Sequence, residues 1–460
     1  MRKVTLLLTL CLLATALAFP QSPNPFGYPV VPDMTADASI TEFDGVFYYY
    51  ATTDGYGQGL ARSGPPTVWK STDFVHWSFC GTYFPSAKDQ IYWAPSKAVK
   101  RNGKYYIFPT INSYMYPAVA DSPEGPFRLA KGEDRFEKPY TASTLLSGED
   151  PSGIDAEIFV DDDGQPYVFF GKRRMARLSD DMTSIVGDVH EIATPRGGYS
   201  EGPIFFKRKG IYYYLYTLDG NENYQYAYVY SRVSPFGPYE SAEQDIITTT
   251  DRETGVYGPG HGCVFNVEGT DDYYIAYLEF GRRETNRQTY VNRLEFNDDG
   301  TIRPVKLDLN GVGALRKPQR ERKIEIAELT ASSVQDTLFI APIKDPLCQR
   351  KECFDVAFAA DGSNGSRWKA DEAESEPWIV ADLGRTRRVG KSAVCFVRPT
   401  MGHAYRLETS KDGQTWTTVS EQLEAKALSP HIDKVRRRCR YLRITILSGE
   451  TGIWEWTLSK

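Results

Sequence analysis

The sequence predicts an all-β protein in which a five-bladed β-propeller, residues 19–315, precedes a jelly-roll β-sandwich, residues 325–460. A strand–turn–strand unit recurs five times in the first part of the chain, which is typical of a propeller. Aromatic residues make up 13% of the chain, and many of the 30 tyrosines lie in runs that favour strands. After the propeller, short apolar segments alternate with regular turns, which indicates a sandwich.

The chain begins with the features of a secretory signal peptide. Residues 1–18, MRKVTLLLTLCLLATALA, combine a basic start, an apolar core and a small-x-small ending, so cleavage is expected after Ala18. Lipid attachment at Cys11 is disfavoured because Leu10 precedes it, where a small residue is needed. No later segment reaches the roughly 20 apolar residues of a membrane span. We therefore expect an exported protein, either periplasmic or secreted.

Six cysteines follow the leader, and export permits disulfides. Cys348 and Cys353 are close enough in the sequence to pair, but six cysteines allow about 15 connectivities. None of them lies in a zinc-type CxxC pair, so we interpret the cysteines as structural or buried.

The formal net charge of −6 argues against a nucleic-acid partner, which a basic surface would attract. Flat aromatic rings stack well on the apolar faces of sugar rings, so a carbohydrate is the expected partner. No membrane-spanning segment is expected. The sequence does not determine the oligomeric state, although a monomer is favoured.

Each of the five repeats consists of a small or polar residue, an apolar strand, a Gly-containing turn and an aromatic strand. The turns, such as FDG, RNG and DDDG, are typical hairpin connections. Equivalent positions are separated by 58, 60, 46 and 60 residues, which fits blades of several strands. The repeats are DASITEFDGVFYYYATT from Asp37, APSKAVKRNGKYYIFPT from Ala94, DAEIFVDDDGQPYVFFG from Asp155, EGPIFFKRKGIYYYLYT from Glu201 and GHGCVFNVEGTDDYYIAYLEF from Gly260.

The innermost strand of each blade runs along the propeller axis, so equivalent positions should converge at one end of that axis. Any one polar residue there is readily explained as a turn former. That explanation does not account for polar residues at the same position of several repeats. Asp33 lies outside this phase and is interpreted as a loop residue. The converging positions are Asp37, Pro95, Asp155, Glu201 and His261, which place three carboxylates and a histidine together.

Through these motifs, residues 23–315 resemble glycoside hydrolase family 43. NPF followed by DMTADAS is similar to the family's opening around its general base, and WAPS at 93–96 is similar to its second-blade motif. GIDAEIFVDDDGQPY, SEGPIFF and GPGHG resemble the motifs of blades three to five, and YVNRLEFNDDGTIRPV resembles the closing strands. The resemblance implies a glycosidase that inverts the anomeric configuration.

The resemblance also implies a role for each carboxylate. Asp37 would be the general base that activates water, Glu201 the general acid, and Asp155 the residue that orients the acid and tunes its pKa. The sequence departs from the family pattern at Ala38, where proline is usual, and at Ala156 in the equivalent place of blade three. Both residues flank the carboxylates, so they put the subfamily in doubt and leave the catalytic assignment in place.

Physical chemistry supports these roles independently of the resemblance. An inverting glycosidase needs an acid and a base about 6.5–9.5 Å apart, with room for a water between them. Residues on different blades can meet that separation across a narrow axis. The acid must be protonated near neutral pH, so burial and a neighbouring negative charge must raise its pKa. Asp155 can supply that charge.

Three further residues each have two interpretations. Arg287 resembles a family arginine near the acid and the substrate, or it is a solvated arginine of a basic loop. Trp93 is either a platform for sugar stacking or part of the packing between blades. The resemblance places His261 beside a central Ca²⁺ or Na⁺ ion, held through water, although a lone histidine is more often structural. No cofactor is expected for catalysis.

The C-terminal part begins after an expected exposed linker, residues 316–324. The segments AADGSNGSRWKA, PWIVADLG, YRLETSKDGQTW, RCRYLRITIL and GIWEWTLSK resemble the galactose-binding-like discoidin or coagulation-factor type C fold, which includes carbohydrate-binding module family 32. The resemblance places a structural Ca²⁺ near Asp361 and Glu455, and oxygen ligands from a tight Asp-Gly loop suit that ion. Whether the sandwich binds sugar or only supports the propeller is left open.

The sequence therefore predicts an exported, inverting exo-glycosidase that removes arabinofuranosyl or, as a second choice, xylosyl units from plant-type polysaccharides. A β-galactofuranosidase or another galactosidase of the same family is the alternative. Two other classes have less support. A carbohydrate-binding protein with an inactive propeller should lack the carboxylates, and a calcium-dependent adhesion protein should bind through apolar loops of the sandwich alone.

Overall fold

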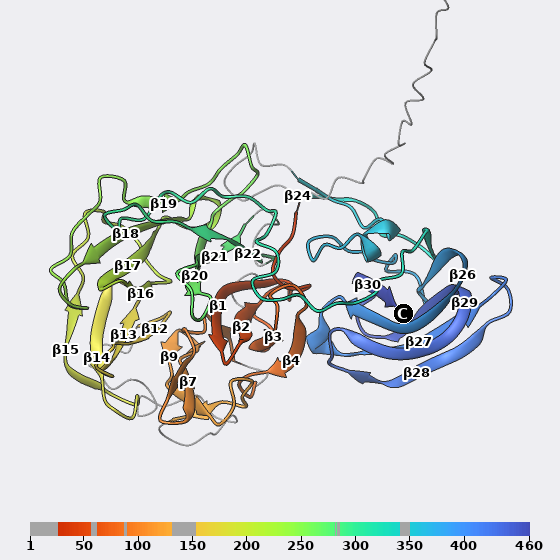
Figure 1. The fold of residues 1–460 in the computed structure, drawn as a ribbon, viewed down its shortest axis with the longest axis horizontal. Coiled ribbons are helices and arrows are strands. Elements are labelled where there is room, and N and C mark those ends of the chain that lie inside the picture. Colours follow the sequence, from red (N-terminus) through yellow and green to blue (C-terminus); the bar gives the residue numbers. More distant parts are fainter. Residues whose placement is uncertain are drawn as a thin grey trace, which may run out of the picture.

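The computed structural model is an almost entirely β protein made of a propeller and a sandwich that lie side by side (Figure 1). The predicted fold class is therefore confirmed. The predicted leader, residues 1–18, lies outside the described part of the chain. None of the described helices is long and apolar enough to cross a membrane. The structure describes residues 26–56, 62–86, 90–130, 153–280, 282, 286–340 and 350–460.

The first blade shows how an aromatic strand joins neighbouring sheets. Successive side chains of a strand point to opposite faces, and the run VFYYYATT uses both. Phe47 and Tyr49 pack with the fifth blade, whereas Tyr48 and Tyr50 pack with the second. The strands of this antiparallel sheet, in spatial order, are β1 (Thr35–Phe43), β2 (Val46–Thr53), β3 (Thr67–Ser71) and β4 (Ser78–Thr82).

Blades two, three and four are also four-stranded, and blade five has three described strands. Blade two comprises β6 (Val99–Arg101), β7 (Lys104–Ile107), β10 (Ala118–Ala120) and β11 (Arg128–Leu129), beside a small sheet of β5 (Tyr92–Trp93), β8 (Thr110–Ile111) and β9 (Tyr114–Met115). Blade three comprises β12 (Glu157–Val160), β13 (Pro166–Phe170), β14 (Arg174–Leu178) and β15 (Ile185–Glu191). Blade four comprises β16 (Ile204–Arg208), β17 (Ile211–Leu218), β18 (Gln225–Ser231) and β19 (Ile246–Thr248), and blade five comprises β20 (Gly260–Asn266), β21 (Tyr273–Glu279) and β22 (Gln288–Leu294).

Aromatic rings fill the spaces between blades. Phe169 of blade three stacks on Phe205 of blade four, with ring centroids 3.9 Å apart and planes inclined by 13°. Phe74 of blade one stacks on Phe265 of blade five at 5.3 Å and 25°. Such pairs contribute about 0.5–1.5 kcal/mol beyond the area that they bury. The aromatic composition therefore serves mainly to hold the blades together.

The N-terminal segment closes the ring against the last blade. The backbone N–H of Tyr28 donates to the carbonyl of Leu309 at 2.7 Å, and that of Val30 donates to Thr289 of β22 at 2.9 Å. Because the same segment continues directly into β1, it ties the first blade to the fifth. This pairing also covers an edge that an open sheet would expose.

The sandwich is built around two long strands, β26 and β29, which bend through bulges. Its core contains the fully buried side chains of Trp368 and Trp456. A separate two-stranded ribbon pairs β24 (Leu338–Ile340) with β25 (Arg350–Glu352). The main sheet comprises β23 (Glu328–Ala331), β26 (Trp378–Phe396), β27 (His403–Ser410), β28 (Thr417–Lys426), β29 (His431–Ser448) and β30 (Ile453–Ser459).

The segment predicted as a linker, residues 316–324, is attached to both parts of the protein. The N–H of Gln319 donates to the Asp73 carboxylate of blade one at 3.0 Å. The N–H of Ile324 donates to the carbonyl of Leu458 in the sandwich at 2.7 Å. The connection between the two domains is therefore anchored by its own backbone on each side.

The described cysteines are all free thiols. Cys263 and Cys439 are buried, whereas Cys80, Cys353 and Cys395 are half-buried. Cys348 lies outside the described residues, and Cys353, which its position in the sequence would allow it to join, is free. The interpretation of the cysteines as buried therefore holds fully for two of them.

Removing one ring of the stacked pair between blades three and four should destabilise the propeller. We expect Phe205→Ala to lower the free energy of unfolding by about 3–5 kcal/mol, because it leaves a cavity against Phe169. Denaturant unfolding followed by tyrosine fluorescence would measure the loss. Val186→Ala, at an exposed position of β15, is the matched control and should change stability by less than about 0.5 kcal/mol.

Candidate active site

A residue in the left-handed conformation stands at the head of the inner strand of every blade. Residues other than glycine rarely adopt a positive φ, so its recurrence marks a shared backbone feature. In blades one and five it coincides with a β-bulge, which redirects the side chain out of the regular strand pattern. The five residues and their φ angles are Asp37 (52°), Ala94 (24°), Asp155 (59°), Gly202 (51°) and His261 (34°).

This feature corrects the repeat phase inferred from the sequence in two blades. The sequence pattern aligned Pro95 and Glu201 with the other axial positions, but the left-handed residues are Ala94 and Gly202. Glu201 therefore projects from the residue before the common position. Gly202 has a steric reason to lack a side chain, because a Cβ there would lie 2.6 Å from the ring of His261.

Threonine hydroxyls fix the backbone at these strand ends. In blades two and three the threonine comes from the preceding blade, so the bond also links neighbouring blades. The side chains of Asp155 and Glu201 consequently extend from backbone that a threonine hydroxyl holds in place. The bonds run from the N–H of Ala94 to Thr52 Oγ1 at 2.8 Å, of Asp155 to Thr110 Oγ1 at 2.9 Å and of Glu201 to Thr217 Oγ1 at 2.9 Å.

Asp37 is a buried carboxylate with two positively charged neighbours. Nη1 of Arg287 lies 3.3 Å from its Oδ1, and Nδ1 of His261 lies 3.4 Å from the same oxygen. Burial alone would raise the pKa of Asp37, but Arg287 and His261 outweigh burial and hold the pKa below its ordinary value. Asp37 is therefore ionised across the neutral range, as a general base must be.

Arg287 is oriented by a residue that the sequence analysis missed. Asp54, at the end of β2, accepts hydrogen bonds from the backbone N–H, Nε and Nη2 of Arg287 at 3.0, 2.8 and 3.1 Å. Both side chains are almost completely buried. The interpretation of Arg287 as a solvated loop residue is wrong. Its bonds are to Asp54 and Asp37, on the side of the predicted base and not of the predicted acid.

Asp155 is a buried carboxyl group that can hold a proton near neutral pH. Burial raises its pKa to about 7, with His261 lowering it and the negative charges of Glu201 and Asp37 raising it. Its Oδ2 accepts a weak hydrogen bond from the N–H of Gly202 at 3.3 Å. The surroundings thus shift the pKa values of Asp37 and Asp155 in opposite directions, as in sites that contain both a base and a proton donor.

Glu201 is the least buried of the three carboxylates. Its Oε1 accepts a hydrogen bond from the hydroxyl of Tyr224, and its Oε2 accepts one from Tyr199. The ring of Tyr224 is buried, whereas Tyr199 is 61% exposed. Neither tyrosine was singled out from the sequence, because both lie in loops without a repeated motif. Glu201 therefore has one face toward the interior and one toward solvent.

The centre of the site offers a metal ion only part of a ligand set. One side-chain atom each of Asp155, Glu201 and His261 lies within 4.8 Å of the others. Ca²⁺ takes six to eight oxygen ligands, and this set provides two carboxylates and a ring nitrogen. His261 already faces Asp37, and the carboxylates raise its pKa against the opposing effect of burial. Direct coordination therefore does not fit, and a contact of His261 with an ion through water stays a prediction.

The surface beside Tyr199 is hollowed. A depression of about 680 Å³ begins at Tyr199 and extends over blade four past Asn223 and Gln225. Trp93 is half-buried in β5, directly before the left-handed Ala94, which places it at the same end of the axis. Its role in sugar stacking stays a prediction.

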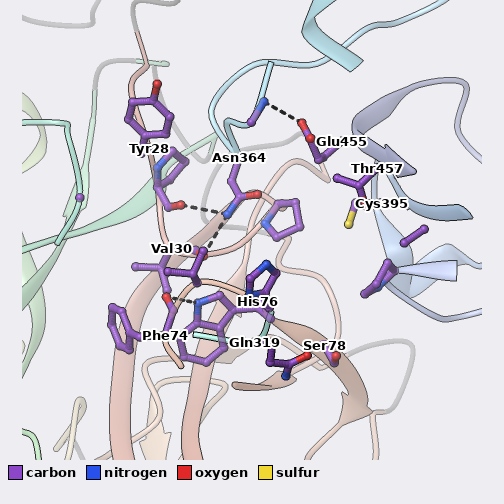
Figure 2. Close-up of a pocket in the computed structure, with 18 of the residues that line it drawn as sticks. Tyr28, Val30, Phe74, His76, Ser78, Gln319, Asn364, Cys395, Glu455 and Thr457 are labelled. Atoms are coloured by element: carbon purple, nitrogen blue, oxygen red, sulfur yellow. Dashed lines mark hydrogen bonds between the residues drawn. The ribbon is translucent and has the colours of Figure 1, made fainter. Parts of the chain in front are cut away.

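In the sandwich, the structure brings Asp361 and Glu455 together. Glu455 lines a cavity of about 360 Å³ between the two domains and accepts a hydrogen bond from the N–H of Gly362 at 3.0 Å (Figure 2). Burial, with a contribution from the charge of Asp361, raises the pKa of Glu455 to about 8. Burial likewise raises the pKa of Asp361. A Ca²⁺ ion at Asp361 and Glu455 stays a prediction.

The model of the glycosyl hydrolases family 43 matches residues 26–302, the stretch that contains all five blades and the carboxylates at their axis. The chain belongs to this family. It is therefore a glycosidase. An F5/8 type C domain model matches residues 341–459, which agrees with the predicted discoidin-like sandwich. The resemblances stated from the sequence are confirmed for both domains.

The chain is similar to several enzymes that act on carbohydrates. The chain is 32% identical to the beta-D-galactofuranosidase xynD of Aspergillus niger, over 64% of this chain and 89% of that protein. It is 26% identical to the arabinoxylan arabinofuranohydrolase of Bacillus subtilis, over 63% of this chain and 66% of that protein. A solved structure titled glycoside hydrolase is 64% identical, covers 95% of this chain and all of its own, and has a TM-score of 0.93.

A calcium ion held by Asp361 and Glu455 should stabilise the sandwich. We expect added Ca²⁺ to raise the midpoint of thermal unfolding of chelator-treated protein, because an ion that binds only the folded state stabilises it. Glu455→Gln should remove this increase, whereas Glu424→Gln, at an exposed position of β28, should leave it intact. Thermal scans with and without Ca²⁺ would show the difference, and equal increases in all three proteins would contradict the site.

Proposed function

We propose that this family 43 enzyme is an inverting exo-glycosidase in which Asp37 is the general base and Glu201 the general acid. The observation that carries the proposal is the pairing of charge states at the propeller axis. Asp37 is kept ionised by Arg287 and His261, while Asp155 holds a proton beside Glu201. An inverting reaction needs this combination of one ready base and one available proton.

In the proposed reaction, Asp37 accepts a proton from a water that attacks the anomeric carbon from one face of the sugar. Glu201 donates a proton to the glycosidic oxygen on the other face as the bond to that oxygen breaks. Asp155 holds a proton beside Glu201 and keeps it available to this acid. The products are the free sugar, with inverted configuration, and the alcohol of the leaving group. No step requires a cofactor.

Furanosyl units are the proposed substrate, with arabinofuranose first and galactofuranose as the second candidate. The similarity to an arabinoxylan arabinofuranohydrolase supports the first candidate, and the similarity to a beta-D-galactofuranosidase supports the second. The two sugars are chemically close, because β-D-galactofuranose has the ring configuration of α-L-arabinofuranose with an additional hydroxymethyl group on its exocyclic carbon. The 32% identity to a beta-D-galactofuranosidase favours the second candidate specifically. Xylosyl units are the third candidate substrate.

We further propose that the enzyme is exported and that it releases a monosaccharide from a polysaccharide or oligosaccharide. Export rests on the leader-like sequence of residues 1–18. The rival interpretation, a carbohydrate-binding protein without activity, requires an incomplete site. The presence of all three carboxylates, each with charged or hydrogen-bonding partners, weighs against it.

A panel of p-nitrophenyl glycosides would test the substrate class. It should contain α-L-arabinofuranoside, β-D-galactofuranoside, β-D-xyloside and β-D-galactopyranoside. We expect release from a furanoside, with proton NMR of the fresh product showing the opposite anomer. A product that retains its configuration would overturn the inverting mechanism, and release from the pyranosides alone would overturn the furanosyl assignment.

The roles of acid and base are separable by the quality of the leaving group. We expect Glu201→Gln to lower kcat on an oligosaccharide by about 10²–10⁴-fold, because the leaving oxygen is no longer protonated. The loss should be much smaller on a dinitrophenyl glycoside, which leaves without a proton. Asp37→Asn should be equally damaging on both substrates, since each needs the activated water. Glu191→Gln, on the exposed edge of β15, is the control.

The pH profile should report the proton on Asp155. We expect kcat/KM to fall as the pH rises through about 7, because the site then loses the proton held beside Glu201. In Asp155→Asn this ionisation is absent, so the residual activity should no longer follow it. An alkaline limb that stays at the same pH in the variant would assign the limb to another group.

A further inference from the structure

The sandwich contacts the propeller beside the candidate active site. The contact is made by the turn after β26, which contains the short 3₁₀-helix η5 (Pro399–Met401). Nη2 of Arg398 donates to the carbonyl of Gly55, directly after β2. The hydroxyls of Tyr56 and Thr400 lie 2.5 Å apart, and the guanidinium of Arg398 lies over the Tyr56 ring at 4.8 Å.

This contact is linked to the proposed base, Asp37, by a short series of hydrogen bonds. Gly55 follows Asp54 in the chain, and Asp54 orients Arg287 through three hydrogen bonds. Arg287 in turn reaches Asp37 through Nη1 at 3.3 Å. A continuous path therefore runs from the sandwich to the carboxylate that is proposed to activate water.

Arg398 is itself held firmly within the sandwich. Its Nε lies 3.0 Å from Oε2 of Glu450, whose other oxygen lies 3.1 Å from Nζ of Lys369. Its backbone is in the left-handed conformation, with φ of 54°. Such a conformation in a residue other than glycine costs energy and persists only where the surroundings enforce it. The carbonyl of Gly55 thus meets a donor whose position is fixed.

Polar groups from both domains enclose the space next to this contact. A small cavity of about 160 Å³ is lined by Asp33 and Asp54 of the propeller and by Lys369, Arg398 and Glu450 of the sandwich. Oδ2 of Asp33 is buried without a hydrogen-bond partner among the described residues. Asp33 was interpreted from the sequence as a loop residue. The structure shows it buried against the sandwich, so the two domains share a polar interior at this point.

We propose that Arg398 of the F5/8 type C domain is a positioning residue of the glycosidase site, acting through Gly55 and Asp54 on Arg287 and the base Asp37. The inference rests on the proposed role of Asp37. Gly55 has φ of +84° and no side chain, so little in its own chemistry restrains the carbonyl that Arg398 holds. A loss of that restraint would let Asp54 move, and displacements of about 1 Å at such sites can cost about 10²-fold in rate.

The consequence is that the sandwich is part of the catalytic unit. The sequence left open whether this domain binds sugar or supports the propeller. The proposal specifies how the sandwich would support the propeller. One of its side chains, Arg398, helps to set the charge environment of Asp37. The titratable and charged groups around Asp37 are Arg287, His261, Asp54, Asp155 and Tyr224.

The test is steady-state kinetics of the full-length Arg398→Ala variant on the best p-nitrophenyl furanoside. We expect kcat to fall about 10- to 10²-fold with KM little changed, because the base and not the binding of the sugar is disturbed. The acidic limb of kcat/KM should move to higher pH. Weaker contact with Arg287 removes a stabilising positive charge from ionised Asp37, so its pKa rises and a higher pH is needed to keep it charged.

Two matched variants separate positioning from general stability. Arg398→Lys keeps a cationic donor near Gly55 and should restore part of kcat and of the pH profile. Arg440→Ala removes another sandwich arginine, whose bonds to Asp382 at 2.9 and 2.8 Å lie within its own domain. It should lower thermal stability without moving the acidic limb.

Wild-type kcat and an unmoved acidic limb in Arg398→Ala would overturn the inference. So would an equal loss of kcat in Arg440→Ala, which would show a general effect of weakening the sandwich. The proposed function has its own separate failure, which is activity that survives Glu201→Gln or Asp37→Asn. If those variants are inactive and Arg398→Ala is normal, only the positioning role is wrong.

Discussion

Charge pairing around the propeller axis is the constraint on which the rest of the structure depends. Three carboxylates lie close together there, two of them almost completely buried. Buried charge is costly unless it is paired or neutralised. Arg287 and His261 pair with Asp37, while burial raises the pKa of Asp155 to about 7, so that this group can be neutral near neutral pH. Because Arg287 and His261 both lie beside Asp37, they lower the pKa of Asp37, while the pKa of Asp155 is raised. Two chemically similar side chains therefore differ in how readily they hold a proton.

The propeller can maintain this arrangement because its blades are joined at several levels. Aromatic rings pack between neighbouring sheets, and threonine hydroxyls bind backbone N–H groups at the axial strand ends. In blades one, three and five the left-handed residue is Asp37, Asp155 or His261, whose side chains form the site. Repulsion between the carboxylates is thus opposed by a scaffold whose own stability comes from packing far from the charges.

The two domains are less independent than their separate family models suggest. The connecting segment is hydrogen-bonded to both, and the sandwich turn at Arg398 reaches the strand end that carries Asp54. The cavity in Figure 2 lies along another part of the same junction, with Asn364 bonded to the backbone of Pro29 and Val30. Contacts of this number and polarity are specific, so the relative position of the domains is itself a property that mutation can alter.

Repetition in the sequence determined the propeller and the convergence of Asp37, Asp155, Glu201 and His261, and short apolar segments between regular turns determined the sandwich. Strand periodicity, turn spacing and repeat length are local properties that a sequence displays directly. The sequence could not determine the exact alignment of blades two and four, where Ala94 and Gly202 adopt the left-handed conformation and Pro95 and Glu201 do not. Nor could it pair Arg287 with Asp54, bring Tyr199 and Tyr224 to the acid, or place Arg398 against Gly55. Those contacts join residues distant in the chain or in loops without a repeat, and only the tertiary structure decides which side chains meet and therefore which carboxylate keeps its charge.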